Sequence, residues 1–231
     1  MDVREPHPPS LSPRALDAAG WIAFLLAGGI FLAIAWSVTS RMPIVMLDAK
    51  VAAWLHTHGS PALTAFMLAV SQANSTLGIA LMSVVFGLVL LRLREWYWML
   101  TVALAVSGGM LLNVALKHLY ERARPHFDDP LVTLDTYSFP SGHVAGAVVF
   151  YGVLAAFLVS RHYDRRVRAA IVTAALAAIA LVGLSRMYLG AHYLSDVLAA
   201  ACSSTAWLVL CLQAVHALVR RKGAAGPTPR V

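Results

Sequence analysis

Six long stretches that lack Asp, Glu, Lys and Arg constrain the fold of this chain more than any other feature. They cover residues 21–40, 62–91, 96–116, 137–160, 169–185 and 197–219. A helix needs about 20 apolar residues to cross the hydrocarbon core of a bilayer, and backbone polar groups in lipid must be satisfied within the segment, which favours helices. Only 13% of the 231 residues are charged, which is well below the share in soluble domains. We therefore predict an all-α, polytopic membrane protein with six transmembrane helices.

The segments between these stretches predict the rest of the organisation. Apolar residues recur every three to four positions between 46 and 58, among polar ones, which is typical of a short interfacial helix. The stretch 62–91 is too long for one upright crossing, and its polar patch at 71–76 indicates either a bend or an interfacial first half. Residues 1–15, which contain four Pro, and the tail 223–231 are expected to be disordered. The membrane domain is predicted at 16–222.

The net charge of +7 is explained better by membrane topology than by binding to nucleic acid. Six crossings put both termini on one side, which then holds twelve Lys and Arg residues against six on the other. Cytoplasmic loops are the ones rich in Lys and Arg. We therefore predict a protein of the cytoplasmic (inner) membrane with both termini in the cytoplasm and no nucleic-acid partner. The six cations on the outer side are Arg41, Lys50, Lys117, Arg122, Arg124 and Arg186.

Lys117 and Arg124 belong to the first of three polar segments on that outer side. Seven residues separate them, which is two helical turns, so both side chains can project from one face. Two cations on one face suit an anionic group such as phosphate. The alternative is an ordinary pair of cations at a helix end that extend toward the interface.

The second polar segment is Ser138-Phe139-Pro140-Ser141-Gly142-His143, in which a helix is expected to start near Pro140. The free N–H groups and the positive dipole end of such a helix bind phosphate readily. Gly142 allows a close approach, and the Ser141 hydroxyl adds a donor. The alternative is a plain serine cap followed by a buried, hydrogen-bonded histidine.

The third polar segment contains Ser185, Arg186, His192 and Asp196. His192 and Asp196 are four residues apart and therefore neighbours on one helical face. A carboxylate that accepts from one imidazole nitrogen fixes the tautomer and leaves the other nitrogen free to attack. The alternative is a structural His–Asp pair, although ionisable residues in membrane segments are functional candidates by default.

All three segments fall on the same predicted face of the membrane. Together they supply three cations, two histidines, one aspartate and a helix N-terminus, which is the equipment that phosphoryl transfer needs. The chain has no Cys/His spacing typical of a metal site and no carboxylate cluster. We therefore expect neither a metal nor a cofactor.

The three motifs, K-x6-RP, PSGH and SR-x5-H-x3-D, occur in this order with no position missing. In this pattern the chain closely resembles the type 2 phosphatidic acid phosphatase family. The resemblance implies a metal-independent phosphatase that forms a phosphohistidine. It implies that His192 attacks phosphorus, that Asp196 orients it, and that His143 protonates the leaving oxygen. The residues implied to hold the phosphate oxygens are Lys117, Arg124, Arg186, Ser141 and Gly142.

The predicted function is hydrolysis of a lipid phosphate or pyrophosphate by a site that faces the periplasmic or extracellular side. Undecaprenyl pyrophosphate, phosphatidylglycerophosphate, phosphatidic acid and a lipid A phosphate all suit such a site, with a lean to the first. The alternatives are phosphotransfer to an acceptor lipid, and binding or transport of a lipid phosphate without turnover. The sequence predicts no oligomeric state.

Other polar residues of these segments have plainer interpretations. Arg122 is a candidate headgroup contact, and Tyr188 and Tyr193 are candidate lining residues. The side chains expected at the interface or in solvated loops are His56, His58, His118, His126, His162, Asp128, Asp129 and Asp135.

Overall fold

Eight helices make up the fold of residues 13–224, the part of the chain that this computed structural model describes. No strand occurs in this range, so the predicted all-α class is confirmed. The predicted disordered segments 1–15 and 223–231 lie mostly outside the described residues. The helices are α1 (Pro13–Thr39), α2 (Pro43–Thr57), α3 (Pro61–Ala73), α4 (Thr76–Arg92), α5 (Trp96–Tyr120), α6 (Gly142–Arg161), α7 (Arg165–Tyr188) and α8 (Leu194–Ala224).

Five of these helices, α1, α5, α6, α7 and α8, are long and apolar enough to cross a membrane. Helices α3 and α4 pass the same test only together, and they are bent by 53° at the break between them. The predicted number of six crossings is therefore reached only if this bent pair forms one span.

Hydrogen bonds at the break stabilise the bend between α3 and α4. Ser75 Oγ accepts from Gly78 N at 3.2 Å and caps the start of α4. Asn74 Nδ2 donates to Val70 O at 2.9 Å, and its Oδ1 accepts from the Tyr151 hydroxyl of α6 at 2.9 Å. Such side-chain bonds replace the helical partners that a helix end lacks. The bend, one of the two alternatives predicted for this patch, is confirmed.

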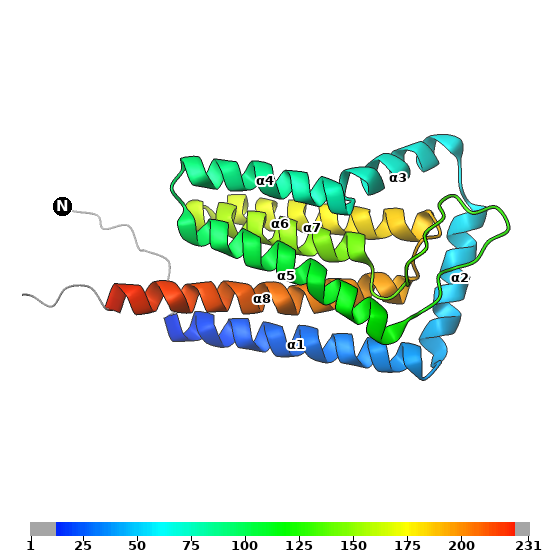
Figure 1. The fold of residues 1–231 in the computed structure, drawn as a ribbon, viewed down its shortest axis with the longest axis horizontal. Helices are drawn as coiled ribbons and strands as arrows, with labels where there is room; N and C mark the ends of the chain where they lie inside the picture. Colours follow the sequence, from blue (N-terminus) through cyan, green and yellow to red (C-terminus); the bar gives the residue numbers. More distant parts are fainter. Residues whose placement is uncertain (1–12, 225–231) are drawn as a thin grey trace, which may run out of the picture.

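Helix α6 packs against α5, α7 and α8 (Figure 1), and it is the most deeply buried of the candidate spans. Val149 and Phe157 of α6 belong to a core that also contains Leu208 of α8. Glycine permits the close packing of α5 on α8, because a Cβ at Gly108 would lie 2.3 Å from the Trp207 ring. This core fixes the position of the first residues of α6, which carry part of the site.

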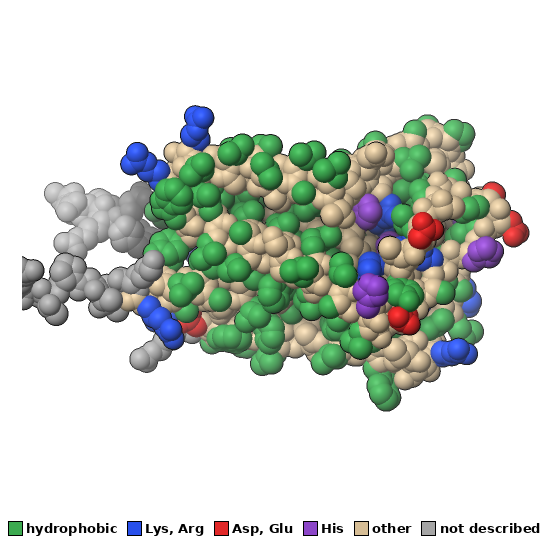
Figure 2. Space-filling model, in the orientation of Figure 1, with side chains coloured by type: hydrophobic (Ala, Val, Ile, Leu, Met, Phe, Trp, Pro, Cys, Tyr) green, Lys and Arg blue, Asp and Glu red, His purple; other side chains and the backbone are tan. Residues whose placement is uncertain are grey.

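The two ends of the bundle carry different groups. The start of α1 and the end of α8 lie together at the left in Figure 1, whereas α2 runs across the opposite end beside the loop that joins α5 to α6. Figure 2 shows His, Asp, Glu, Lys and Arg side chains gathered at that opposite end, with mostly apolar side chains along the middle of the face. The polar residues singled out from the sequence therefore meet at the end away from the described ends of the chain.

Candidate active site

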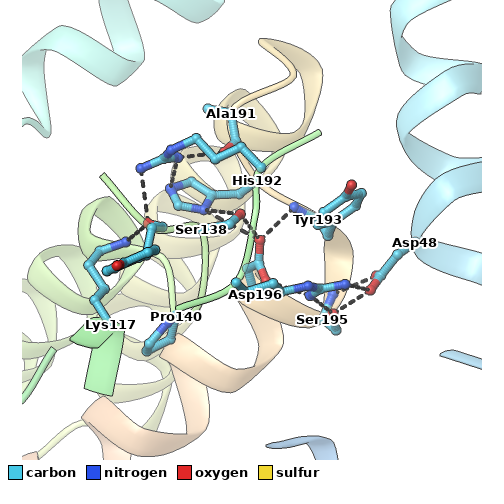
Figure 3. A network of polar contacts seen from close by, with 12 residues as sticks. Asp48, Lys117, Ser138, Pro140, Ala191, His192, Tyr193, Ser195 and Asp196 are labelled. Carbon is cyan, nitrogen blue, oxygen red and sulfur yellow. Dashed lines mark hydrogen bonds and ion pairs between the residues drawn. The ribbon is translucent and has the colours of Figure 1, made fainter. Parts of the chain in front are cut away.

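Helices α5, α6, α7 and α8, with the loop after α5 and the turn before α8, bring the predicted site residues together at the end of the bundle that α2 crosses. Figure 3 shows part of this cluster. Lys117 comes from the last turn of α5, and Arg124 comes from the loop that follows. Arg186 comes from the last turn of α7, and His192 and Asp196 come from the turn before α8 and from its first turn. Ser141, Gly142 and His143 begin α6.

His192 and Asp196 form the predicted pair in a buried position. Nδ1 of His192 lies 3.5 Å from Oδ2 of Asp196, and the side chains are 2% and 0% exposed. The other ring nitrogen, Nε2, lies 3.3 Å from Nη1 of Arg124. Burial, the largest effect, lowers the pKa of His192 to about 4, against the opposing influence of Asp196. The imidazole is therefore neutral at pH 7, with Nε2 directed toward a cation that can hold an anionic substrate.

Ser138 and Tyr193 complete the surroundings of the Asp196 carboxylate. Ser138 Oγ donates to Asp196 Oδ2 at 2.5 Å and lies 3.4 Å from His192 Nδ1, and Tyr193 N donates to the same carboxylate oxygen at 2.9 Å. The sequence prediction included Ser138 in the second polar segment but gave it no role of its own. Ser138 touches both members of the pair and so restricts how each can turn.

Backbone carbonyls hold two of the three predicted phosphate-binding cations. Lys117 Nζ donates to the Tyr137 carbonyl. Arg124 donates to the carbonyls of Thr136 at 2.7 Å, Ala191 at 2.6 Å and Tyr137 at 3.1 Å. Burial is also the main cause that lowers the pKa of the Arg124 guanidinium below its ordinary value. Both cations are thus oriented toward the segment around residue 137, beside His192.

Arg186 and Ser141 each have a buried polar atom that lacks a hydrogen-bond partner. Arg186 Nη1 donates to Ser71 Oγ, but its Nε has no partner, and neither has Ser141 Oγ, among the side chains that the structure describes. A buried polar group without a partner is costly. Two such atoms, both from residues predicted to bind phosphate, fit a site that receives an anion.

Gly142 and His143 lie in the same cluster. A Cβ on Gly142 would lie 3.2 Å from Asn113 Oδ1 and 4.0 Å from Lys117 Cε, so glycine keeps the start of α6 close to α5. The cations that act electrostatically on the His143 ring are Arg186, Arg124 and Lys117. The structure thus groups all eight predicted site residues, and their roles stay predictions.

Arg122 binds two carboxylates, whereas the sequence suggested it as a contact for the substrate headgroup. Its Nη1 donates to Asp196 Oδ1 at 2.6 Å, and its Nη2 donates to Asp48 Oδ2 at 2.8 Å. The guanidinium lies over the Tyr193 ring, with Cζ 4.3 Å from the ring centroid. Asp48, which the sequence places on an amphipathic helix, is completely buried. Sequence reasoning missed Asp48 because no motif or helical spacing connects it to Arg122.

His56 and Asp129, for which the sequence suggested plainer interpretations, hold the loop between α5 and α6 against α2. His56 Nε2 bonds Asp129 Oδ1 at 2.8 Å, and its ring stacks on Phe127 with centroids 4.1 Å apart. Its hydrogen bond is the first cause that lowers the pKa of the Asp129 carboxyl. Tyr188, considered as a lining residue, instead places its hydroxyl 2.9 Å from Thr64 Oγ1. These contacts tie α2 and α3 to the loop and to α7.

Among residues 13–224, no group of three or more His, Cys, Asp or Glu side chains is arranged to hold a metal ion. The functional groups that the site gathers are cations, hydroxyls, one carboxylate and imidazoles. This set suits binding of an anion and nucleophilic attack on it.

Comparisons with known proteins agree with this chemistry. The family model described as PAP2 superfamily matches residues 96–220. Phosphatidylglycerophosphatase B of Bacillus subtilis (strain 168) is 34% identical over 140 residues, which are 60% of this chain and 68% of that protein. A probable lipid phosphate phosphatase beta of Arabidopsis thaliana is 28% identical over 181 residues, 69% of this chain and 84% of that protein.

A solved structure with a similar fold is the transmembrane PAP2-type phosphatidylglycerolphosphate phosphatase of Bacillus subtilis. Its TM-score is 0.76 at 27% sequence identity, and the match covers 86% of this chain and 96% of that one. The region that the family model matches carries every site residue predicted from the sequence, whereas Asp48 lies outside it.

Proposed function

Because the chain belongs to the PAP2 superfamily and its relatives are named as lipid phosphatases, we propose that it hydrolyses a membrane lipid phosphate or pyrophosphate through a phosphohistidine on His192. One observation carries this proposal: a buried imidazole has Nδ1 beside the Asp196 carboxylate and Nε2 beside the Arg124 guanidinium. This arrangement leaves Nε2 as the nucleophile and places a cation where the attacked phosphate would lie.

In the first step the lone pair of His192 Nε2 attacks phosphorus, and the bond from phosphorus to the leaving oxygen breaks. A proton from His143 neutralises the leaving oxygen. The positive charge that develops on the His192 ring is stabilised by Asp196. In the second step water attacks the phosphohistidine, His143 takes up a proton from that water, and inorganic phosphate leaves with His192 restored.

The cations supply the electrostatic part of the mechanism. Lys117 and Arg124 exchange their carbonyl partners for phosphate oxygens, and Arg186 Nε and Ser141 Oγ gain the partners that they lack. Arg186 Nε and Ser141 Oγ have no partner to give up, and donors that are already in place for developing charge cost no reorganisation during the reaction. Gly142 allows the start of α6 to approach the phosphate.

The name of the matching Bacillus subtilis phosphatase, in sequence and in structure, favours phosphatidylglycerophosphate as the substrate, ahead of undecaprenyl pyrophosphate and phosphatidic acid. We place the protein in the cytoplasmic membrane with its termini in the cytoplasm and its site on the opposite face. Two features support this placement: the site lies at the end away from the described chain ends (Figure 1), and the Lys/Arg-rich turns lie with those ends.

The test is phosphate release by the purified full-length protein in detergent with EDTA. The substrates are phosphatidylglycerophosphate, a prenyl pyrophosphate and phosphatidic acid. We expect release by the wild type, none by His192→Ala, and near wild-type release by His162→Ala, an exposed histidine that follows α6. Release by His192→Ala at the wild-type rate would contradict the proposed nucleophile. If no lipid releases phosphate but a labelled phosphoryl group reaches an acceptor lipid, the protein is a transferase.

A further inference from the structure

One arginine bridges two completely buried carboxylates beside the His192–Asp196 pair (Figure 3). Nη1 of Arg122 binds Asp196 Oδ1 at 2.6 Å and Nη2 binds Asp48 Oδ2 at 2.8 Å. Both carboxylates are 0% exposed, and the arginine side chain is 11% exposed. Asp196 thus uses Oδ1 for Arg122 and Oδ2 for His192, Ser138 and the Tyr193 N–H.

Asp48 also fixes the start of α8. Its Oδ1 accepts from Ser195 N at 2.9 Å, and its Oδ2 accepts from Ser195 Oγ at 2.5 Å. The first N–H groups of a helix have no partner inside the helix, and here a side chain from α2 satisfies one of them. Ser195 directly precedes Asp196, so Asp48 holds the backbone from which the catalytic carboxylate projects.

The charges in this bridge explain why a second carboxylate is needed. Arg122 on Asp196 alone would cancel the negative charge that has to stabilise the His192 ring when it becomes positive. In a low-dielectric interior this cancellation is strong. Asp48 offsets the Arg122 charge, so the three groups together keep one negative charge next to His192.

We propose that Asp48 and Arg122 are positioning residues for the nucleophile: through Asp196 they hold and electrostatically support His192, which makes α2 part of the catalytic site. The inference rests on the proposed function. It assigns Arg122 to the carboxylates rather than to the substrate, because both of its Nη atoms are bound to them and Tyr193 covers its face. Asp48 lies outside the residues that the family model matches.

The test compares two anions that the same cations bind. Inorganic phosphate reports on the cations alone, whereas vanadate takes the five-coordinate geometry of the transition state with the nucleophile as a ligand, so it also reports on His192. Binding of each anion is measured by titration calorimetry on the full-length protein in detergent, and kcat and KM are measured with phosphatidylglycerophosphate.

For Asp48→Asn we expect vanadate affinity and kcat to fall by about 10- to 100-fold, the range in which partners that orient catalytic groups act, with phosphate affinity and KM unchanged. Arg122→Lys should show the same pattern, since an ammonium cannot bridge both carboxylates. If Asp48→Asn does not fold, Arg122→Lys alone tests the inference. Asp128→Asn, at an exposed loop carboxylate, is the control and should leave all four quantities unchanged.

The double variant Asp48→Asn/Arg122→Gln removes both opposite charges and should be less impaired than the product of the effects of Asp48→Asn alone and Arg122→Gln alone, which is also measured. An unchanged kcat in both single variants would overturn the inference. So would a joint loss of phosphate and vanadate binding in Arg122→Lys, which would make Arg122 a substrate ligand. A wild type that binds neither anion would instead refute the proposed function, and the inference with it.

Discussion

Replacement of Arg186 by lysine tests the site most directly. The side chain is 3% exposed, its Nη1 donates to Ser71 Oγ, and its Nε has no partner among the described side chains. Arginine can therefore remain anchored on Ser71 while its other nitrogens bind phosphate. A lysine ammonium at the end of a flexible side chain cannot bind both Ser71 and the phosphate in a fixed geometry.

The size of the effect follows from the number of bonds lost. Arg186→Lys removes one or two charge-assisted hydrogen bonds to the phosphate in the transition state, which cost about 2–4 kcal/mol in total. At about 1.4 kcal/mol for each factor of ten, kcat/KM should fall by about 30- to 1,000-fold. Most of the loss should appear in kcat, because charge on the phosphate oxygens shifts during the reaction.

The assay is phosphate release from phosphatidylglycerophosphate in detergent micelles, with kcat and KM determined separately. Arg161→Lys, the same substitution in an arginine that pairs with Glu95, is the matched control and should keep its activity. Ser71→Ala should reduce kcat/KM less than Arg186→Lys does. If Arg186→Lys turns over within about threefold of the wild type, or only as poorly as Ser71→Ala, the guanidinium does not bind phosphate and our reading of the site is wrong.

Three further predictions concern the metal, the pH and Ser138. Activity should survive an excess of EDTA, and loss that is restored by a divalent cation would contradict a mechanism based on protein cations. Because burial holds the pKa of His192 at about 4, below its usual value of about 6.5, the unfolded chain binds a proton that the folded protein does not. The contribution of the neutral His192 to the free energy of unfolding is fully present above about pH 6.5 and should fall toward pH 4 by up to roughly 1.4 kcal/mol per pH unit. In detergent, the Tm of His192→Gln should therefore decline less steeply with falling pH than the Tm of the wild type. Equal declines of Tm in the two proteins would contradict this prediction. Ser138→Ala removes a donor to the Asp196 carboxylate and should lower kcat by about tenfold at constant KM, whereas a change confined to KM would place Ser138 on the substrate instead.

The parts of the site that the sequence predicts well are those fixed by local geometry. His192 and Asp196 are four residues apart and do form a pair, although His192 lies in the turn before α8 and not on the helix, so helical spacing was only part of the reason. Lys117 and Arg124 also reach one cluster, although Arg124 lies beyond the end of α5 in the loop, so helical periodicity was only part of the reason. The apolar stretches predict the spans because the bilayer sets their length.

The parts that sequence reasoning missed depend on contacts between distant segments. Asp48 is 74 residues from Arg122 and 147 from Ser195, and no periodicity relates them. An aspartate on an amphipathic helix looks the same in the sequence whether it faces lipid headgroups or, as here, accepts hydrogen bonds from an arginine and from the first residues of another helix. The break between α3 and α4 was only half predicted for a similar reason, since the Tyr151 hydroxyl that supports it comes from α6.

The carbonyls that hold Lys117 and Arg124 have a consequence for turnover. Thr136, Tyr137 and Ala191 already satisfy these cations, so an arriving phosphate replaces neutral dipoles rather than meeting bare charges. The gain in binding is the difference between a charged and a neutral acceptor, which is smaller than the full attraction. Once inorganic phosphate forms, the same carbonyls can take the cations back. Under the proposed function, these resting contacts would favour release of the inorganic phosphate that the protein makes.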